Sequence, residues 1–366
     1  MKIIIVEHRF HYSGPVAQRL LAYSRAFMEN GHQVVMILSS QTPLPNELDG
    51  IRIIEIQESK RHLIKCYSQF IRTIKREYTK DSFIFFYEPQ IYSFLFRASK
   101  FRTISEQTEI PNYGYKMSFL RRIIEAIRLY ANKHFNGVVC ISQGLKEYYH
   151  NKGVKNVDVI NMFVDPSRFE NVQVETNDKY IAYCGTISIH KDGVDTLVKA
   201  FAVFRKAFPD YKLYLIGDFD KLGSEGVIRG LIEDLGIGES VVLTGRVNAD
   251  DMPKMLMGAQ MLALSRPDNT QSQFGFPTKL GEYLATGKPV VVTKVGEIPL
   301  YLHDGENAYM ANPDDVNDFA NKLIEVASDY PTALKVAQKG KELAYMEFSS
   351  KVQSERLIDF IKHVCI

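Results

Sequence analysis

Tryptophan is absent from this chain of 366 residues, and cysteine is scarce. The four cysteines are scattered and include no C-x-x-C pair, which is typical of reduced thiols in a cytosolic protein and excludes a disulfide scaffold. They are Cys66, Cys140, Cys184 and Cys365. Asp218 and Asp220 form one D-x-D pair, but acceptors in a turn after a strand use the same spacing. We therefore expect neither a metal nor another cofactor.

Long hydrophobic runs are lacking as well. Only four apolar residues lie between Lys2 and Glu7, too few for the core of a signal peptide, and no stretch approaches the ~18 apolar residues of a membrane span. The composition, 45% hydrophobic and 24% charged, is that of a globular chain, and 366 residues exceed what one core usually organises. We expect a cytoplasmic protein of two domains.

The net charge of +2 conceals a division along the chain. Residues 1–170 carry 24 Lys and Arg against 16 Asp and Glu, whereas residues 171–366 carry 21 against 27. A basic first half joined to an acidic second half indicates two domains with different partners. Chance asymmetry on two solvated surfaces is the alternative explanation.

Short β-branched runs alternate with helical patterns, and the alternation occurs twice. The expected strands are 2–6, 33–38, 51–56, 83–87, 102–105 and 137–141, and then 179–184, 212–216, 241–244, 261–264 and 289–293. Such alternation predicts the α/β class, with two Rossmann-like domains whose parallel sheets face each other across a cleft. We place the domains at residues 1–168 and 169–349, and the last helix, within 350–366, on either of them.

Ligands bind in such sheets beyond the carboxyl ends of the strands. In the second domain the richest segment there reads P-T-K-L-G-E. Pro277 suits the entry to a helix and Thr278 its N-cap, so the amides from Thr278 to Leu280 form an anion site, to which Lys279 adds a full charge. Glu282 lies one turn further, where a carboxylate can accept hydrogen bonds from two ribose hydroxyls. The combination suits a nucleoside diphosphate, and a helix with routine surface charges is the alternative.

Two further cations are expected at the same edge. Lys191 lies in the loop 185–193 after a buried strand, where its charge would offset that of a departing phosphate. Arg266 follows the strand 261–264 and suits bidentate binding of phosphate. The plain alternatives are a solvated lysine in a turn and a salt bridge at the rim.

The first domain offers weaker signals. Gly14 precedes a helix, where backbone can approach a phosphate or a sugar. Glu106 and Glu109 follow a strand, and Glu106 is our candidate for orienting or deprotonating an acceptor hydroxyl. His8 here and His190 in the second domain border the expected cleft, although a lone histidine more often serves packing.

The ordered motifs resemble those of the retaining glycosyltransferases of family 4, which have the GT-B fold. The similarity runs through most of the chain and is strongest over residues 179–310. It rests on N-G-H-Q-V near the start, on C-I-S-Q-G-L-K-E-Y-Y and V-D-P-S-R-F at the end of the first domain, and on Y-I-A-Y-C-G-T, H-K-D-G, L-T-G-R-V, P-T-K-L-G-E-Y-L-A-T-G-K-P-V-V and G-E-I-P in the second.

The resemblance implies transfer of a hexose-like sugar from a nucleotide-diphosphate-sugar to a hydroxyl of a saccharide or lipid-linked saccharide. The anomeric configuration is retained and no metal is needed, and the process served is bacterial cell-surface polysaccharide or glycoconjugate synthesis. Carried over by position, Lys191 binds the diphosphate and Glu282 the ribose. The expected donor contacts are Gly14, Gly185, Thr186, Lys191, Arg266, Pro277, Thr278, Lys279, Leu280 and Glu282, and the expected catalytic residues are Lys191, Arg266 and Glu106.

Three positions depart from the family pattern. Phe274 stands where the family often has a glutamate, and Thr186 stands where an arginine is frequent. Glu106 stands where many relatives have a histidine. Arg266 and Lys279 are our candidates for replacing the missing charge, and the donor sugar stays open.

Two basic amphipathic stretches lie in the first domain, at residues 60–80 and 117–135. Each combines an apolar stripe with several lysines and arginines, a pattern that predicts attachment to anionic lipid near a lipid-linked acceptor. Alternatively, the stripes pack on the sheet and the charges are solvated. Two other functions also stay open, a sugar-nucleotide epimerase and a non-catalytic protein that binds nucleic acid through its basic half. No recognition motif favours nucleic acid, so we expect none as a partner.

Overall fold

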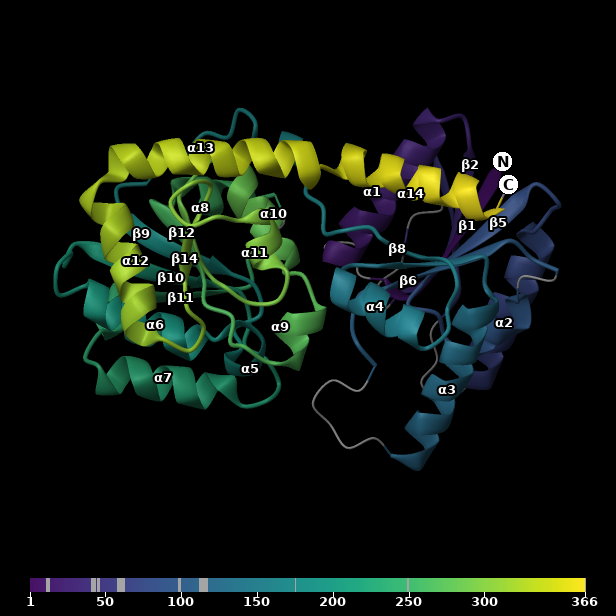
Figure 1. Cartoon of the computed structure of the whole chain (residues 1–366), viewed down its shortest axis with the longest axis horizontal. Helices are drawn as coiled ribbons and strands as arrows, with labels where there is room; N and C mark the ends of the chain where they lie inside the picture. Colours follow the sequence, from purple (N-terminus) through teal and green to yellow (C-terminus); the bar gives the residue numbers. More distant parts are fainter. Residues whose placement is uncertain are drawn as a thin grey trace. The chain divides into compact units, whose positions relative to one another are not determined.

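The computed structural model describes residues 1–10, 14–40, 44, 47–57, 63–97, 100–111, 118–174, 176–248 and 250–365. The chain forms two compact units (Figure 1). Unit 1 comprises Met1–Asn161 and Ser350–Ile366, and unit 2 comprises Met162–Ser349. Each unit holds one sheet covered by helices, so the predicted α/β class with two parallel sheets is confirmed. The division falls before the predicted boundary at residue 168, and the last helix belongs to unit 1.

The sheet of unit 1 has eight strands in the order β3-β4-β2-β1-β5-β6-β7-β8. The bounds are Lys2–Phe10 (β1), Gln33–Ser40 (β2), Glu47–Leu48 (β3), Ile51–Glu55 (β4), Ser82–Tyr87 (β5), Thr103–Gln107 (β6), Gly137–Cys140 (β7) and Val157–Val159 (β8). Within the described ranges only the β3–β4 pair is antiparallel. Ile3, Ile4 and Ile5 of the central strand β1 are fully buried, as expected of a strand that helices cover on both faces.

Five α-helices and one 3-10 helix accompany the described part of this sheet. They are α1 (Pro15–Glu29), α2 (Leu63–Glu77), η1 (Ile91–Phe96), α3 (Phe119–His134), α4 (Gln143–Asn151) and α14 (Ser350–Cys365). Pro15 opens α1, where its fixed φ suits the first turn, and Gly31 with φ +75° follows the C-cap of this helix.

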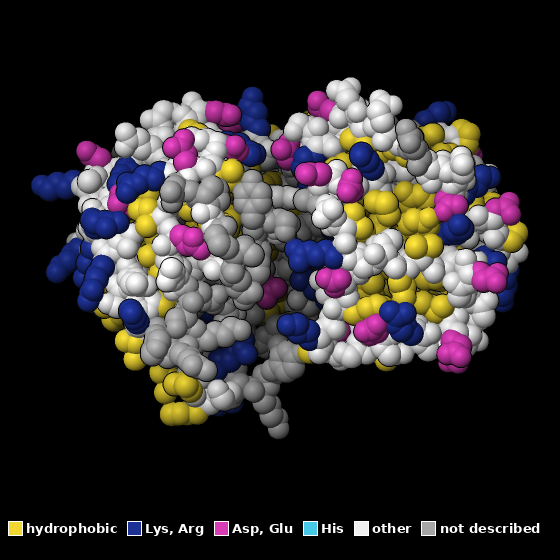
Figure 2. All heavy atoms as spheres, turned by 180° about the vertical axis from the view of Figure 1, so that it is seen from behind, with side chains coloured by type: hydrophobic (Ala, Val, Ile, Leu, Met, Phe, Trp, Pro, Cys, Tyr) yellow, Lys and Arg dark blue, Asp and Glu magenta, His cyan; other side chains and the backbone are white. Residues whose placement is uncertain are grey.

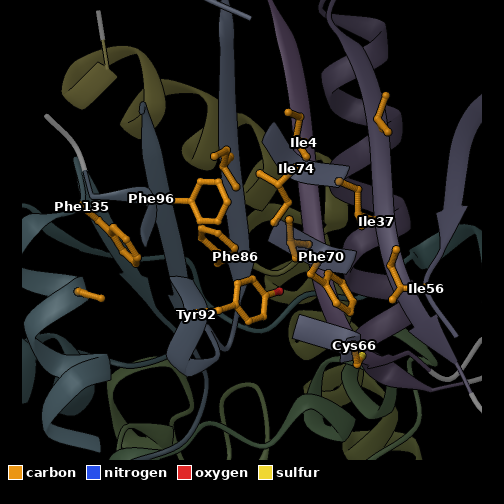
Figure 3. Close-up of a cluster of buried hydrophobic side chains, with 14 residues drawn as sticks. Ile4, Ile37, Ile56, Cys66, Phe70, Ile74, Phe86, Tyr92, Phe96 and Phe135 are labelled. Atoms are coloured by element: carbon orange, nitrogen blue, oxygen red, sulfur yellow. The ribbon is translucent and has the colours of Figure 1, made fainter. Parts of the chain in front are cut away.

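A hydrophobic cluster fills the space between α2 and the sheet (Figure 3). Phe70 and Ile74 of α2 are fully buried there, together with Phe86 of β5. Most of the apolar stripe predicted on this helix therefore packs on the sheet. This is the alternative to lipid attachment that the sequence left open. Leu63 and Ile64, at the start of α2, are instead 55% and 86% exposed.

The helix α14 completes unit 1 although it follows unit 2 in the sequence. It packs on α1, and the side chain of Gln353 accepts a hydrogen bond from the Asn161 amide at 2.8 Å. The ring of Phe360 lies against Gly137, where a Cβ would come within 2.7 Å of it. Unit 1 therefore depends on a segment that follows the whole of unit 2 in the sequence.

The sheet of unit 2 has six parallel strands in the order β11-β10-β9-β12-β13-β14. Their bounds are Lys179–Cys184 (β9), Tyr211–Ile216 (β10), Val241–Gly245 (β11), Met261–Leu264 (β12), Val290–Thr293 (β13) and Tyr309–Ala311 (β14). The order runs outward in one direction from β9 and in the other from β12. The loops after these two strands therefore diverge, and this switch point is where open α/β sheets bind ligands.

Helices in the described part of unit 2 cover this sheet and connect its strands. They are η2 (Pro166–Phe169), α5 (Ile189–Asp192), α6 (Val194–Phe204), α7 (Ser224–Asp234), η3 (Gly238–Ser240), α8 (Met252–Gly258), α9 (Thr270–Phe274), α10 (Thr278–Ala285), α11 (Ile298–Tyr301), α12 (Val316–Ser328) and α13 (Tyr330–Glu347). None of the helices in the described ranges of either unit combines the length and the apolar character needed to cross a bilayer. Cys66, Cys140 and Cys184 are buried and free.

Candidate functional site

Charged side chains gather at the switch point of unit 2. Lys279, in the first turn of α10, forms an ion pair with Asp192 of α5, and its Nζ donates to the hydroxyl of Tyr183 at 3.1 Å. The Tyr183 hydroxyl lies 2.7 Å from Asp192 Oδ2. Arg266, which follows β12, places its Nε 3.9 Å from the other carboxylate oxygen. Asp192 is thus the point at which cations from two different segments meet.

Burial governs the electrostatics of this cluster. The side chains of Asp192 and Arg266 are 2% and 3% exposed, and that of Lys279 is 15% exposed. Burial alone would raise the pKa of Asp192, but the charges of Lys279 and Arg266 and the hydrogen bonds from Lys279 and Tyr183 hold it below its usual value. Burial lowers the pKa of Lys279, Asp192 opposes this, and nearby Lys191 adds to the lowering. The three cations less one carboxylate leave two positive charges, which match the two negative charges of an esterified diphosphate.

Two glycines allow the backbone to come close to the cluster. Gly193 ends α5 with φ +62°, and a Cβ there would overlap the carbonyl oxygen of Ser265. A Cβ on Gly185, with φ +144°, would overlap the ammonium group of Lys279. The hydroxyl of Ser265 donates to the Gly193 carbonyl at 2.8 Å, which joins the loop after β9 to the end of β12. Only glycine combines these backbone angles with so little space.

Hydrogen bonds at the start of α9 stabilise the segment between β12 and α10. Asn269 caps α9 by accepting a hydrogen bond from the Ser272 amide, and the Ser272 hydroxyl in turn accepts one from the Asn269 amide. The side-chain amide of Asn269 also donates to the carbonyl of His190 at 2.8 Å. Arg266 therefore stands on a segment that is fixed to the loop carrying Lys191.

The helix α10 begins one residue earlier than predicted. Pro277, and not Thr278, is the N-cap, and Thr278 is the first helical residue, with an exposed side chain. The amide of Leu280 donates to the Pro277 carbonyl at 3.0 Å, so it is engaged within the helix. The amides of Thr278 and Lys279 stay as the candidates for the anion site.

Glu282 has a partner that the sequence analysis did not foresee. It forms an ion pair with Arg168 of η2 through Oε1, and both side chains are 21% exposed. Arg168 belongs to the motif V-D-P-S-R-F. The arginine of this motif is the feature of the sequence from which a partner for Glu282 could have been proposed. Burial raises the pKa of the Cys184 thiol to about 12, and the charge of Glu282 adds to the rise, which places this carboxylate beside the end of β9. Arg168 thus holds the carboxylate of Glu282 near the strand end at which the cationic cluster lies.

Lys191 and Thr186 lie at the rim of the cluster. Ser188 caps α5 by accepting a hydrogen bond from the Lys191 amide at 3.2 Å, and the Lys191 side chain is exposed. Thr186 is exposed too, and its carbonyl lies 2.6 Å from the Tyr183 hydroxyl. His190 is exposed and contributes its backbone carbonyl to the loop.

In unit 1, Glu106 is less accessible than predicted. The strand β6 extends to Gln107, so Glu106 lies inside it and not after it. The carboxylate is fully buried and forms an ion pair with Arg19 of α1, whose Nε donates to Oε1 at 2.6 Å. Arg19 also donates to the carbonyls of Ile160 and Asn161, both at 2.8 Å. These contacts give Glu106 a structural role, because through Arg19 they connect β6 and α1 to residues 160–161, where the first segment of unit 1 ends.

Glu88 is a second carboxylate at this edge, and the sequence analysis did not single it out. It follows β5 with φ +44°, a conformation that is rare for a non-glycine residue and unusual before a proline such as Pro89. Its Oε1 accepts a hydrogen bond from the hydroxyl of Thr108 at 2.6 Å. Burial raises the pKa of Glu88, and the charge of Glu109 adds to the rise, while Thr108 opposes it. Backbone strain of this kind is found most often where a side chain is aimed at a ligand.

The remaining predicted residues of unit 1 have other surroundings. The ring of His8 stacks on Phe70 with centroids 4.0 Å apart, and its Nε2 lies 2.6 Å from the Tyr92 hydroxyl, which is a packing role. Gly14 is the N-cap of α1 with an ordinary φ of −91°. Residues 11–13, directly before Gly14, and residues 112–117, after Glu109, lie outside the described residues.

The D-x-D pair lies at the carboxyl end of β10. Asp220 accepts hydrogen bonds from the Ser224 hydroxyl at 2.7 Å and the Leu222 amide at 3.0 Å, as an acceptor in a turn does. Nowhere in the described ranges do three His, Cys, Asp or Glu side chains gather as metal ligands would.

Comparisons with known proteins show which proteins this chain is similar to. Residues 178–329 match the model of the glycosyl transferases group 1. The chain is 23% identical over 257 residues to the lipopolysaccharide core biosynthesis glycosyltransferase LpsE of Rhizobium meliloti, which covers 69% of this chain and 72% of LpsE. It is a glycosyltransferase of the GT-B type. The sequence-based resemblance is thereby confirmed at this level.

Two further relatives define the extent of the similarity. This glycosyltransferase is 26% identical over 225 residues to the N-acetyl-alpha-D-glucosaminyl L-malate synthase of Bacillus anthracis, which covers 58% of the chain and 56% of the synthase. The crystal structure of HepE from Anabaena in complex with UDP and glucose superposes with a TM-score of 0.78 at 16% identity, over 99% of this chain and 100% of HepE. The glycosyltransferase thus has the GT-B fold along its whole length.

Proposed function

We propose that the chain transfers a sugar from a nucleotide-diphosphate-sugar to a hydroxyl of a saccharide or lipid-linked saccharide, with retention of the anomeric configuration. The observation that carries the proposal is the convergence of Lys279 and Arg266 on Asp192 at the end of β9, with Glu282 one turn along α10. The cations bind the diphosphate, with the amides of Thr278 and Lys279. Glu282 accepts hydrogen bonds from the ribose, and its ion pair with Arg168 holds the carboxylate in place.

The chemistry requires charge stabilisation more than a nucleophile. The bond between the anomeric carbon and the diphosphate oxygen breaks, and the acceptor oxygen forms a bond to that carbon on the same face. The acceptor proton passes to a phosphate oxygen of the leaving group. Lys191, Lys279 and Arg266 offset the charge that develops on the diphosphate, which is the task that a divalent metal performs in other transferases. Because these three cations less the Asp192 carboxylate leave two positive charges, which match the diphosphate, we propose a metal-independent reaction.

The names of the relatives support a nucleotide-sugar donor and a saccharide acceptor. HepE binds UDP and glucose in its crystal structure, and LpsE is a glycosyltransferase of lipopolysaccharide core biosynthesis. We infer a role in bacterial cell-surface polysaccharide or glycoconjugate synthesis for this chain.

For the acceptor we propose Glu88 in place of Glu106. Glu106 is buried and forms an ion pair with Arg19, so it is not accessible to an acceptor. Glu88 lies at the carboxyl end of β5 and is only partly buried. A carboxylate held by one hydrogen bond, from Thr108, retains capacity to orient a sugar hydroxyl.

The test is turnover of a panel of nucleotide-sugars with and without saccharide acceptors. We expect Lys191→Ala and Glu282→Ala each to lower kcat/KM for the donor about 100-fold or more, as the loss of a charge-stabilising group does, with circular dichroism unchanged. Lys206→Ala and Glu233→Ala, which change exposed residues of unit 2, serve as controls. Wild-type rates in the two site variants would refute the assignment, and turnover of the donor to an epimer without acceptor would replace the transferase with an epimerase.

A further inference from the structure

The start of α3 is exposed on every side. Ser118 is the N-cap, and all residues from Ser118 to Ile123 are exposed, which covers more than one full helical turn. Phe119, Leu120 and Ile123 are 81%, 66% and 42% exposed. A helix that merely covers a sheet buries one face along its length, so this turn extends past the body of unit 1, at the lower end of α3 in Figure 1. We call the turn Ser118–Ile123 the α3 tip.

The α3 tip carries positive charge beside its apolar side chains. Arg121 and Arg122 are both exposed within it. Unit 1 as a whole has 26 Lys and Arg against 16 Asp and Glu, a net charge of +10, whereas unit 2 has 19 against 27. Figure 2 shows hydrophobic side chains gathered at the lower end of unit 1, with Lys and Arg side chains near them. A second exposed apolar pair with a lysine, Leu63, Ile64 and Lys65, opens α2.

Both helices begin at the same end of unit 1. Each follows a strand of the parallel part of the sheet, β4 before α2 and β6 before α3, so each begins beyond the carboxyl edge of that sheet. Both also contribute to the one hydrophobic cluster on a single face of the sheet, α2 through Phe70 and α3 through Ala131. The two exposed apolar starts therefore lie at the edge where unit 1 would receive an acceptor.

We propose that the α3 tip inserts into the surface of an anionic lipid bilayer, with the start of α2 as a second contact. Large apolar side chains flanked by arginines suit the boundary between headgroups and acyl chains, where the apolar groups are buried and the cations meet lipid phosphate. A stable protein–protein interface needs about 800 Å² and 20–30 residues from each partner, more than one projecting turn offers. Nucleic acid would use the charge through its phosphates, but the aliphatic side chains of Leu120 and Ile123 contribute no phosphate contact.

The absence of tryptophan makes insertion directly measurable. Phe119→Trp places a single indole at the α3 tip of the full chain. With vesicles of phosphatidylcholine and phosphatidylglycerol at low salt, we expect a blue shift of its emission and quenching by brominated lipid. Met346→Trp, at a residue of unit 2 that is 71% exposed, is the matched control and should show neither change. Vesicles of phosphatidylcholine alone should bind much more weakly.

Co-sedimentation with the same vesicles measures separately how much the arginines and the apolar side chains of the α3 tip contribute to binding. Arg121→Gln with Arg122→Gln should weaken binding about 25-fold, since each basic residue near an anionic surface is worth about fivefold. Phe119→Ser with Leu120→Ser should weaken it at least tenfold at unchanged net charge. Lys335→Gln with Lys339→Gln and Val227→Ser with Met346→Ser remove exposed charge and exposed apolar surface from unit 2, and should leave binding unchanged.

The inference rests on unit 1 alone, and its test needs no turnover, so it can fail while the transferase proposal stands. A chain that ignores anionic vesicles overturns it, as does vesicle binding without a blue shift of the Phe119→Trp emission. A self-association that the Phe119→Ser, Leu120→Ser variant abolishes in sedimentation equilibrium would instead assign the tip to contacts between copies. Tighter binding of duplex or single-stranded nucleic acid than of vesicles, lost in the arginine variant, would also overturn it.

Discussion

Asp192 stabilises two cations at one point before any donor binds. Without its carboxylate, Lys279 and Arg266 would lie close together and largely desolvated, with like charges repelling each other. With it, the cluster is preorganised, and the diphosphate has only to compete for cations that are already gathered at Asp192. The carboxylate is therefore a positioning group of the site.

The first prediction concerns the stability that Asp192 contributes. Asp192→Asn should lower the free energy of unfolding by about 3 kcal/mol, because removing one partner of a buried pair leaves the other uncompensated. Asp195→Asn is the control, since its partner Lys199 is 41% exposed and such pairs are worth under about 1 kcal/mol. Urea denaturation measures both, and equal losses would show that Asp192 is not the centre of the cluster.

The second prediction is a pH dependence of donor binding. Burial lowers the pKa of Lys279, so its proton is lost at a lower pH than the ordinary lysine value of about 10.4. Affinity for a nucleoside diphosphate should then decrease as pH rises through that pKa, because the neutral amine no longer attracts phosphate. Lys279→Arg should remove this decrease, since a guanidinium keeps its proton. Calorimetric titration from about pH 7 to 10 checks both, and a flat wild-type profile would contradict the assignment.

At the scale of elements, the site depends on loops that cross closely at the carboxyl ends of β9 and β12. Gly193→Ala should destabilise unit 2 by about 2–4 kcal/mol, because it combines a left-handed φ with an overlap on the Ser265 carbonyl. Gly236→Ala is a matched control, since Gly236 has φ +63° with nothing within 4 Å of the added Cβ, and should cost only about 1 kcal/mol. The difference in thermal unfolding between the two variants isolates the close approach of the loops, and no difference would contradict it.

The sequence predicted elements better than it predicted their ends and their distant partners. The β-branched runs located the central strands, because a buried parallel strand carries its signal in consecutive residues. Glu106 was misplaced because the polar sequence S-E-Q looks like a loop, and its partner Arg19 is 87 residues away. The pairing of Arg168 with Glu282 was not predicted for the same reason, since 114 positions separate the two residues in the sequence. Local patterns contain no information on such pairings.

The anion site shows the same limit within a single helix. The segment P-T-K-L-G-E predicted the start of α10 to within one residue, because proline and the polar residues after it mark a helix entry. It did not reveal that Lys279 turns toward Asp192, which lies on a loop 87 residues earlier. The residues of the cluster were nearly all named in advance, but the carboxylate that gathers them was not.

At the scale of the whole molecule, sequence order and folding units differ. Unit 2 is one continuous segment, whereas unit 1 needs both ends of the chain. The positive net charge of unit 1 then has a physical explanation in its proposed contact with an anionic surface. A charge division that could have been chance is thereby tied to a structural boundary.

The discontinuity of unit 1 leads to the last prediction. A chain ending at Ser349 lacks α14, so it loses the hydrogen bond from the Asn161 amide to Gln353 and the packing of Phe360 on Gly137. We expect unit 1 of this chain to be unfolded or aggregated, because removing a whole helix from a core costs more than the 5–15 kcal/mol that a domain usually has. The segment 162–349 alone should fold and bind a nucleoside diphosphate, since its sheet and its cation cluster are complete. Proteolysis and calorimetry of the two products test this. Cooperative unfolding of unit 1 without α14 would show that its core does not need the helix, and a segment 162–349 that cannot fold would show that unit 2 depends on unit 1.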